Sequence, residues 1–323
     1  MRISTSTAYD RGTAAILREN VDLNKTLLQI ATGKRILTPA DDPADSARIL
    51  GLNQQNERTT KFQDNIRAAE TNLEIEETTL QSVVDLLQRV RELAVQGSND
   101  TYDADQRKSI SFEIKQLDDS LFGYANTVNG QGEYLFAGYK IDTIPFTRGV
   151  NDDVRYDGDH GQKNVQIGAS RQIATGDNGY DVFMDASGVV GNDGTTKVSL
   201  FKVVSDLEET LRTNDGPASG PTLPLGTSPE SFHAAMQRNL DNIDIALGKI
   251  LDIQATIGAR QNATQSQSDV NADMLVQIQT TMSETQDLDY ATAISRMELQ
   301  QLGLTAAQQS FTKIQGLSLF NFI

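Results

Sequence analysis

A regular alternation of apolar side chains, four and then three residues apart, begins at Phe62 and continues to Ala94. This spacing places the side chains on one seam of a long helix, which buries the seam against another helix in a left-handed supercoil. A helix from Pro43 to about Gln96 would be about 80 Å long, far longer than an ordinary globular helix. The apolar positions are Phe62, Ile66, Ala69, Leu73, Leu80, Val83, Leu87, Val90 and Ala94, with Glu76 as the only interruption.

A second seam of matching length lies near the other end of the chain, after Ser228 and Pro229, which suit a helix cap and a first helical residue. Two long helices of equal length, far apart in sequence, most simply pair as one antiparallel rod. Polar residues occupy the middle of this seam, from Gln261 to Asn271, and we interpret them as a device for register rather than a binding site. The apolar positions are Met236, Leu240, Ile243, Leu247, Ile250, Ile257, Leu275, Ile278 and Met282.

A shorter helix is predicted over 103–128, with Asp103 and Gln106 spaced as a capping pair. Because a short connection follows the first long helix, this helix should lie antiparallel to it as a third member of the rod. Its seam consists of Ile110, Ile114, Leu117, Leu121, Tyr124 and Val128.

Glycine-rich sequence with short alternating runs separates the helical regions and predicts short strands and tight turns. The predicted strands are 154–156, 165–167 and 181–184. One amphipathic helix, 200–211, should end this insert, before a linker with prolines at 217, 221, 224 and 229. The fold class is therefore mainly α with an inserted β-rich domain. We predict three domains: terminal helices (1–40 with 286–323), a helical rod (41–133 with 226–285) and an outer β-rich insert (134–225).

The stretch from Thr38 to Arg48, TPADDPADSAR, has two interpretations, a metal site or a joint between helices. Its acidic residues lack the alternating spacing, the glycine and the distal glutamate of a calcium loop. A joint accounts for the residues better, because glycine closes a helix, proline prevents its continuation, and aspartate followed by proline starts the next one. The predicted elbow residues are Gly33, Pro39, Asp41, Asp42 and Pro43.

The two chain ends carry weaker seams, each about half apolar. An isolated helix of this kind cannot offset its own ordering entropy, so we expect both ends to be mobile in the monomer and helical only on association. The predicted packing positions are Ile16, Leu23, Leu27 and Ile30 at the N-terminal end, and Tyr290, Ile294, Met297, Leu304, Phe311, Leu319 and Phe320 at the C-terminal end.

Composition argues against several classes of protein. A net charge of −16 disfavours nucleic acid as a partner, and all of that charge lies between residues 61 and 285. Cysteine is absent, and neither His160 nor His233 has the spacing of a zinc ligand, so the sequence predicts no cofactor and no enzyme activity. No apolar run is long enough for a membrane span, and the first residues do not resemble a signal peptide.

Several motifs along the chain resemble those of the flagellin superfamily, in its hook-associated branch. They are GKRILTPADDPADSAR at 33–48, GEYLFAG at 132–138, YDGDHGQ at 156–162, DLDYATAISRM at 287–297 and GLSLFNFI at 316–323. The resemblance implies a secreted structural protein of the bacterial flagellum, exported through the type III channel, with terminal helices paired in an inner tube. It also implies a ring of copies between hook-associated protein 1 and flagellin, and a cytoplasmic export chaperone.

Three alternatives stay open. A flagellin-like filament subunit is the nearest competitor, although the Pro39 and Pro43 form of the joint and the 317–323 ending favour the hook-associated branch. A signalling coiled coil of the chemoreceptor type would need a membrane span. A flagellum-like protein with an enzymatic insert would need reactive groups, and two isolated histidines and a 92-residue insert, 134–225, argue against it.

Overall fold

A computed structural model describes residues 5–149, 153–187, 189, 197–213 and 231–320. The chain forms two compact units, unit 1 (Met1–Thr60 with Ala272–Ile323) and unit 2 (Lys61–Asn271). The predicted fold class is confirmed, although the described strands are short and pair only as two-stranded hairpins. The helices are α1 (Thr5–Thr32), α2 (Pro43–Gly97), α3 (Ala104–Ala125), α4 (Leu200–Thr213), α5 (Phe232–Gln286) and α6 (Tyr290–Phe320), and the strands are β1 (Phe146–Arg148), β2 (Val154–Tyr156), β3 (Asn164–Gln166), β4 (Gln172–Ala174), β5 (Ala186–Ser187) and β6 (Lys197–Val198).

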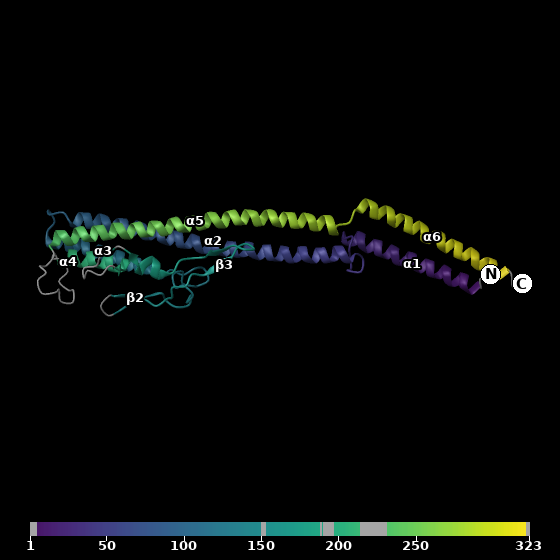
Figure 1. The fold of residues 1–323 in the computed structure, drawn as a ribbon, viewed down its shortest axis with the longest axis horizontal. Coiled ribbons are helices and arrows are strands. Elements are labelled where there is room, and N and C mark those ends of the chain that lie inside the picture. The colour runs from purple at the N-terminus through teal and green to yellow at the C-terminus, as the bar shows by residue number, and fades with distance from the viewer. Residues whose placement is uncertain (1–4, 150–152, 188, 190–196, 214–230, 321–323) are drawn as a thin grey trace. The chain divides into compact units, whose positions relative to one another are not determined.

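The long helices α2 and α5 run antiparallel through unit 2, as the seams predicted (Figure 1). Residues late in α2 contact residues early in α5, and residues early in α2 contact residues late in α5. Arg91 pairs with Asp244 at 2.6 Å, and Gln63 donates to the carbonyl of Ser268 at 2.9 Å. The predicted seam of α2 is fully buried from Ile66 onward, including Glu76. The apolar period of the two seams therefore predicted the pairing of α2 with α5 correctly.

The start of α5 differs from the prediction. Ser228 and Pro229 lie outside the described residues, and the helix begins at Phe232. The hydroxyl of Ser231 accepts a hydrogen bond from the backbone N–H of Ala234 at 3.3 Å. A serine three residues later than expected thus supplies the first-turn acceptor.

The capping box of α3 is confirmed, but its predicted end is wrong. The Asp103 carboxylate accepts from the backbone of Gln106 at 2.8 Å, and the Gln106 side chain accepts from the backbone of Asp103 at 3.0 Å. The helix ends at Ala125 because the side chain of Asn126 bonds to Phe146 and turns the chain towards β1. Val128 therefore lies outside the helix, in an isolated bridge with Tyr134.

Four phenylalanine rings form the centre of the core in unit 2. Phe183 lies 5.1 Å from Phe136, 5.4 Å from Phe146 and 5.9 Å from Phe201, measured between ring centroids. Helix α4 packs beside α3 and buries its predicted apolar face, as expected from its spacing. Because each aromatic ring buries a large apolar area, this cluster joins the insert to the helices.

The inserted segment contains two predicted strands and one error. Strand β2 matches the predicted strand 154–156, and β3 covers most of the predicted 165–167. The predicted strand 181–184 is wrong, because Tyr180–Met184 forms a π-helical turn, η1. Asn178 explains the difference, since its side-chain oxygen accepts from the backbone of Asp181 at 3.0 Å and its amide donates to the Asp181 carboxylate. The prolines at 217, 221 and 224 lie outside the described residues.

The polar middle of the α2–α5 pair receives the β3–β4 hairpin. Asn271 donates to the carbonyl of Ile167 at 2.9 Å, and Asn65 donates to the carbonyl of Gln166 at 2.8 Å. A small apolar cluster, formed by Ile66, Ala69, Ile167 and Ile173, lies at the same place. One polar residue of the seam, Asn271, therefore satisfies the carbonyl of Ile167, a buried residue of the insert.

Candidate assembly interface

Helices α1 and α6 lie side by side and antiparallel within unit 1 (Figure 1). The ring of Phe311 lies 5.0 Å from the ring of Tyr9, and Phe311 also covers Gly12 so closely that an added Cβ would come within 2.8 Å of it. Further along, Gly303 faces the carboxylate of Glu19. Glycines thus allow close approach at two points of this helix pair.

The predicted packing residues of this pair divide into two groups. Ile16, Leu23 and Ile30 on α1 are half-buried, as are Met297, Leu304 and Phe311 on α6. Leu27, Tyr290 and Ile294 stay largely exposed, between 43% and 50%. The side chains of Leu319 and Phe320 lie outside the part of the chain that the structure describes. One helix partner therefore covers only part of the predicted apolar surface.

Five further aliphatic side chains on these helices are even more exposed, and none was predicted as a packing residue. We call them the aliphatic stripe: Leu17, Val21 and Leu28 on α1, and Leu299 and Leu302 on α6, each 57% to 69% exposed. The sequence signal was present, because residues 17, 21 and 28 share a helix face beside the seam that was chosen. The prediction considered a single apolar face for each helix, so it missed the second face of α1, formed by residues 17, 21 and 28.

The predicted elbow residues lie between the end of α1 and the first residue of α2. Gly33 has a φ of 69°, and its N–H donates to the carbonyl of Gln29, so it closes α1 in the left-handed conformation. Pro39 occupies the second position of a turn closed by the N–H of Asp41 and the carbonyl of Thr38 at 3.0 Å. The sequence placed the proline where its fixed φ suits such a turn.

Asp41 is the central acceptor of the elbow. Its carboxylate accepts from the backbone N–H groups of Leu37 and Thr38 and pairs with the Lys25 ammonium at 2.6 Å. The bond with Lys25 and the backbone bonds lower the pKa of Asp41 to about 2. The group therefore stays ionised at all but strongly acidic pH, and it ties the elbow back to α1.

Asp42 and Pro43 start α2. The Asp42 carboxylate accepts from the backbone N–H of Asp45 at 3.1 Å, which lowers the pKa of Asp42, and Pro43 is the first residue of the helix. The Arg35 guanidinium pairs with Asp42 and Asp45 and donates to the carbonyl of Thr285 at 3.0 Å. Each carboxylate of the predicted joint therefore has a hydrogen-bonding role of its own.

The elbow also includes the linker between α5 and α6, which the sequence did not predict. Lys34 and Asp287 form an antiparallel bridge, with Arg35 N–H donating to Gln286 and Leu288 N–H donating to Gly33. Asp289 then caps α6, and its bonds with Thr292 lower its pKa. No local sequence signal could have shown this pairing, because its two halves lie about 250 residues apart.

Within the described residues, no group of three His, Asp or Glu side chains is placed to hold a metal ion. Over the same ranges, no helix is both long and apolar enough to cross a bilayer. The features that distinguish unit 1 are thus its paired helices, the aliphatic stripe and the double elbow.

Comparison with known proteins shows which proteins this chain resembles. Residues 3–141 match the N-terminal helical region of bacterial flagellin. The chain is 29% identical to flagellar hook-associated protein 3 of Escherichia coli over 99% of both chains. The chain is therefore similar to bacterial flagellin in its N-terminal part and to a flagellar hook-associated protein along almost its whole length.

Two further proteins are similar to this chain, one in sequence and one in fold. It is 29% identical to flagellin of Bacillus subtilis, with 81% of this chain and 79% of that protein covered. The solved structure of the flagellar junction protein FlgL from Legionella pneumophila has the same fold, with a TM-score of 0.57, 22% identity and coverage of 74% of this chain and 100% of that one. The similarity to hook-associated protein 3 therefore extends further along the chain than the similarity to flagellin.

Proposed function

We propose that the chain is a subunit of the junction between the flagellar hook and the flagellin filament, where copies form a ring. Similarity to hook-associated protein 3 along 99% of both chains supports this role more strongly than the partial similarity to flagellin. The work of such a subunit is done by the geometry of association, and no reactive group takes part in it.

The observation that carries the proposal is the aliphatic stripe. Leu299 and Leu302 are each 69% exposed on a helix that already has a partner. Burying an aliphatic side chain contributes about 1.5–3 kcal/mol, so five such residues on one helix pair favour a packed assembly of several copies. The half-buried seam residues Ile16, Leu23, Met297 and Phe311 would pack within each subunit, and the stripe between subunits.

A head-to-tail arrangement would give the ring two different faces. In a heterologous contact, the surface above a subunit differs from the surface below it. One face would match hook-associated protein 1, and the other would match flagellin. The double elbow around Gly33, Pro39 and Asp41 would set the direction in which the terminal helix pair leaves the long helices.

Export of the chain would precede assembly. We propose passage through the flagellar type III channel, with a cytoplasmic chaperone holding the apolar C-terminal segment beforehand. Exposed leucines on α6 would aggregate if they were left uncovered in the cytoplasm. The same surface would thus be covered first by the chaperone and later by neighbouring copies.

The test is electron microscopy of a deletion strain complemented with variants. The deletion should leave hooks without filaments and release flagellin into the medium. The double variant Leu299→Ser, Leu302→Ser should fail to restore filaments. The matched control is Leu251→Ser, which changes a leucine of α5 that is 46% exposed, and it should restore them. Filaments on hooks of the deletion strain would contradict the proposal.

The alternative is a flagellin-like filament subunit, which the similarity to Bacillus subtilis flagellin keeps open. Immunogold labelling of intact flagella separates the two roles. A junction subunit should be labelled in one narrow zone next to the hook, whereas a filament subunit should be labelled along the whole filament.

A further inference from the structure

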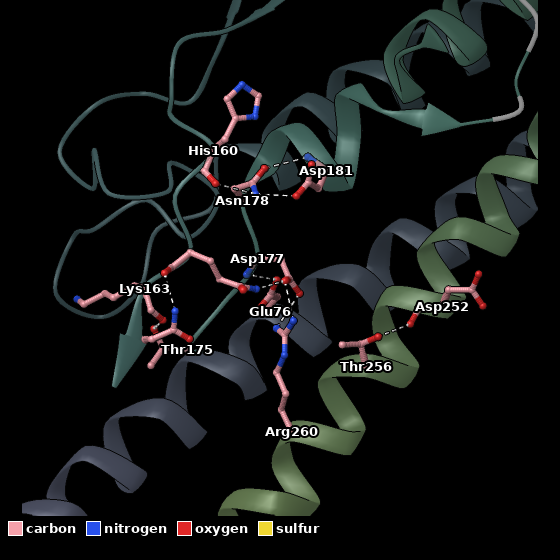
Figure 2. Close-up of polar contacts among 12 residues, drawn as sticks. Glu76, His160, Lys163, Thr175, Asp177, Asn178, Asp181, Asp252, Thr256 and Arg260 are labelled. Carbon is pink, nitrogen blue, oxygen red and sulfur yellow. Dashed lines mark hydrogen bonds and ion pairs between the residues drawn. The ribbon is translucent and has the colours of Figure 1, made fainter. Parts of the chain in front are cut away.

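The segment from Gln162 to Asn178 is fastened to both long helices of unit 2 through Asp177 (Figure 2). The Asp177 carboxylate accepts two hydrogen bonds from the Arg260 guanidinium of α5, each 2.9 Å long, and one from the Gln162 amide at 2.7 Å. The backbone N–H of Asp177 donates to the Glu76 carboxyl of α2 at 3.1 Å. One residue therefore links the segment to α2 and α5 together.

Glu76 is a polar residue in an otherwise apolar seam, between Leu73 and Leu80. It is 1% exposed, and its Oε2 atom has no hydrogen-bond partner among the described residues. A Cβ added at Gly176 would lie 3.4 Å from Oε2, so the segment closes directly over this oxygen. Enclosing a charged carboxylate in such a place costs several kcal/mol unless a counter-charge is bound to it.

The charges around Glu76 provide only part of that counter-charge, because the attraction of Arg260, which lowers the pKa of Glu76, is smaller than the opposing effects of burial and of Asp177. Arg260 forms a bidentate ion pair with Asp177. The negative charge of Asp177 in turn repels an ionised Glu76. Burial first, and Asp177 second, raise the pKa of Glu76 to about 8. The other ionisable side chains that line hollows at this junction are Glu133, Tyr134, Lys163, Asp181 and Lys249.

We propose that Glu76 is a proton-controlled latch, which in its neutral form keeps the 162–178 segment closed on α2 and α5 and on ionisation favours its opening. A neutral carboxylic acid needs no counter-ion in the closed site, whereas a carboxylate needs water. Opening of the segment is the movement that admits water. Opening would also uncover the apolar cluster formed by Ile66, Ala69, Ile167 and Ile173.

The direction of the pH effect follows from proton linkage. The closed state holds its proton up to about pH 8, whereas an open, solvated Glu76 releases it near pH 4.5. Between these values, opening releases a proton, so the opening equilibrium rises up to about tenfold for each pH unit. Above about pH 8 the opening equilibrium levels off. Closure is therefore strongest at acidic pH and weakest in alkaline solution.

Hydrogen exchange measured by mass spectrometry on the full chain tests the latch. Peptides covering 162–178 are compared at pH 5.5, 7 and 8.5, with exchange times corrected for the intrinsic pH dependence of amide exchange. In the unmodified protein, protection should fall by about tenfold for each pH unit up to about pH 8. Glu76→Gln cannot ionise, so its protection should be independent of pH. Glu74→Gln, which changes an exposed carboxylate on the same helix, should behave like the unmodified protein.

A second measurement covers the case in which Glu76→Gln fails to close at any pH. The carboxyl carbon of Glu76 is followed by NMR in the unmodified protein. A midpoint near pH 8 supports the latch, and a midpoint near pH 4.5 overturns it. Equal pH dependence of protection in the unmodified protein and in Glu76→Gln would also overturn it.

Discussion

Unit 1 and unit 2 use the same kind of long helix but leave different surfaces uncovered. In unit 2, the seams of α2 and α5 are buried by each other, by α3 and α4, and by a cluster of phenylalanine rings. In unit 1, α1 packs chiefly against α6 among the described residues, and the aliphatic stripe stays exposed. We propose from this difference that unit 2 is stable by itself, whereas unit 1 is completed by other subunits.

The contrast also separates two uses of polar residues. In unit 2, polar groups in the seam bond to the insert, as Asn271 does with the carbonyl of Ile167. In unit 1, polar groups gather at the elbow, where Asp41 accepts backbone hydrogen bonds within the turn and Asp289 accepts those that begin α6. Polar side chains thus fasten the insert in one unit and shape the turn in the other.

The largest effect on stability should come from the aromatic core of unit 2. Phe183→Ala removes a fully buried ring that contacts three others, so it should lower the free energy of unfolding by about 3–5 kcal/mol. The control Phe112→Ala changes a ring on α3 that is 60% exposed, and it should cost less than about 0.5 kcal/mol. Chemical denaturation followed by circular dichroism measures both. Equal losses of unfolding free energy in the two variants would contradict the claim that the core of unit 2 makes this unit stable by itself.

The elbow should affect assembly more than folding. The double variant Pro39→Ala, Pro43→Ala loosens the turn and the start of α2, because alanine does not fix φ. We expect fewer filaments retained on hooks, with the thermal unfolding of unit 2 unchanged. Motility assays and counts of attached filaments measure the effect. Normal motility with normal filament retention would contradict a role for the elbow.

A smaller and purely local effect is expected at the capping box of α3. Asp103→Ala removes the acceptor for the first turn and should cost about 1 kcal/mol of stability. Asp103→Asn keeps an acceptor of similar quality and should be nearly neutral. Denaturant titration of both variants decides between a cap and a simple surface charge, since a charge alone would be lost equally in both.

The smallest expected effect is a loss of stability at acidic pH, when Asp41 becomes protonated. The pKa of Asp41 is lowered in the folded state, so its contribution is present above about pH 4 and is lost as the pH falls towards about 2. In Lys25→Gln, the pKa of Asp41 should move back towards 3.8, whereas Lys34→Gln, at a neighbouring exposed lysine, should leave it low. An NMR titration of the Asp41 carboxyl carbon measures the shift. An unchanged midpoint in Lys25→Gln would show that the ion pair with Lys25 is not its main cause.

The sequence predicted the long elements better than the short ones, for a physical reason. The seam from Ile66 to Ala94 repeats often enough to identify one helix face, and the pairing of α2 with α5 follows from it. The segment 181–184 offered four residues, and the side chain of Asn178 decided its conformation. Local bonds of this kind outweigh strand propensity in short segments.

The candidate interface was predicted only in part. Gly33, Pro39 and Pro43 were predicted from turn and capping chemistry, which acts locally. The bridge between Lys34 and Asp287 depends on residues far apart in the chain, so no window of sequence contains it. The aliphatic stripe was missed because Leu17 and Leu299 lie beside the single seam that periodicity favoured, although their exposure is the main evidence for partners.

Hydrogen exchange on the monomer and on assembled flagella tests the central claim most directly. We predict that residues 5–32 and 290–313 exchange rapidly in the monomer and become protected on assembly, whereas 73–94 and 236–257 are protected in both states. Terminal helices that are equally well protected in the solitary chain would contradict the account, because unit 1 would then need no neighbours to be stable.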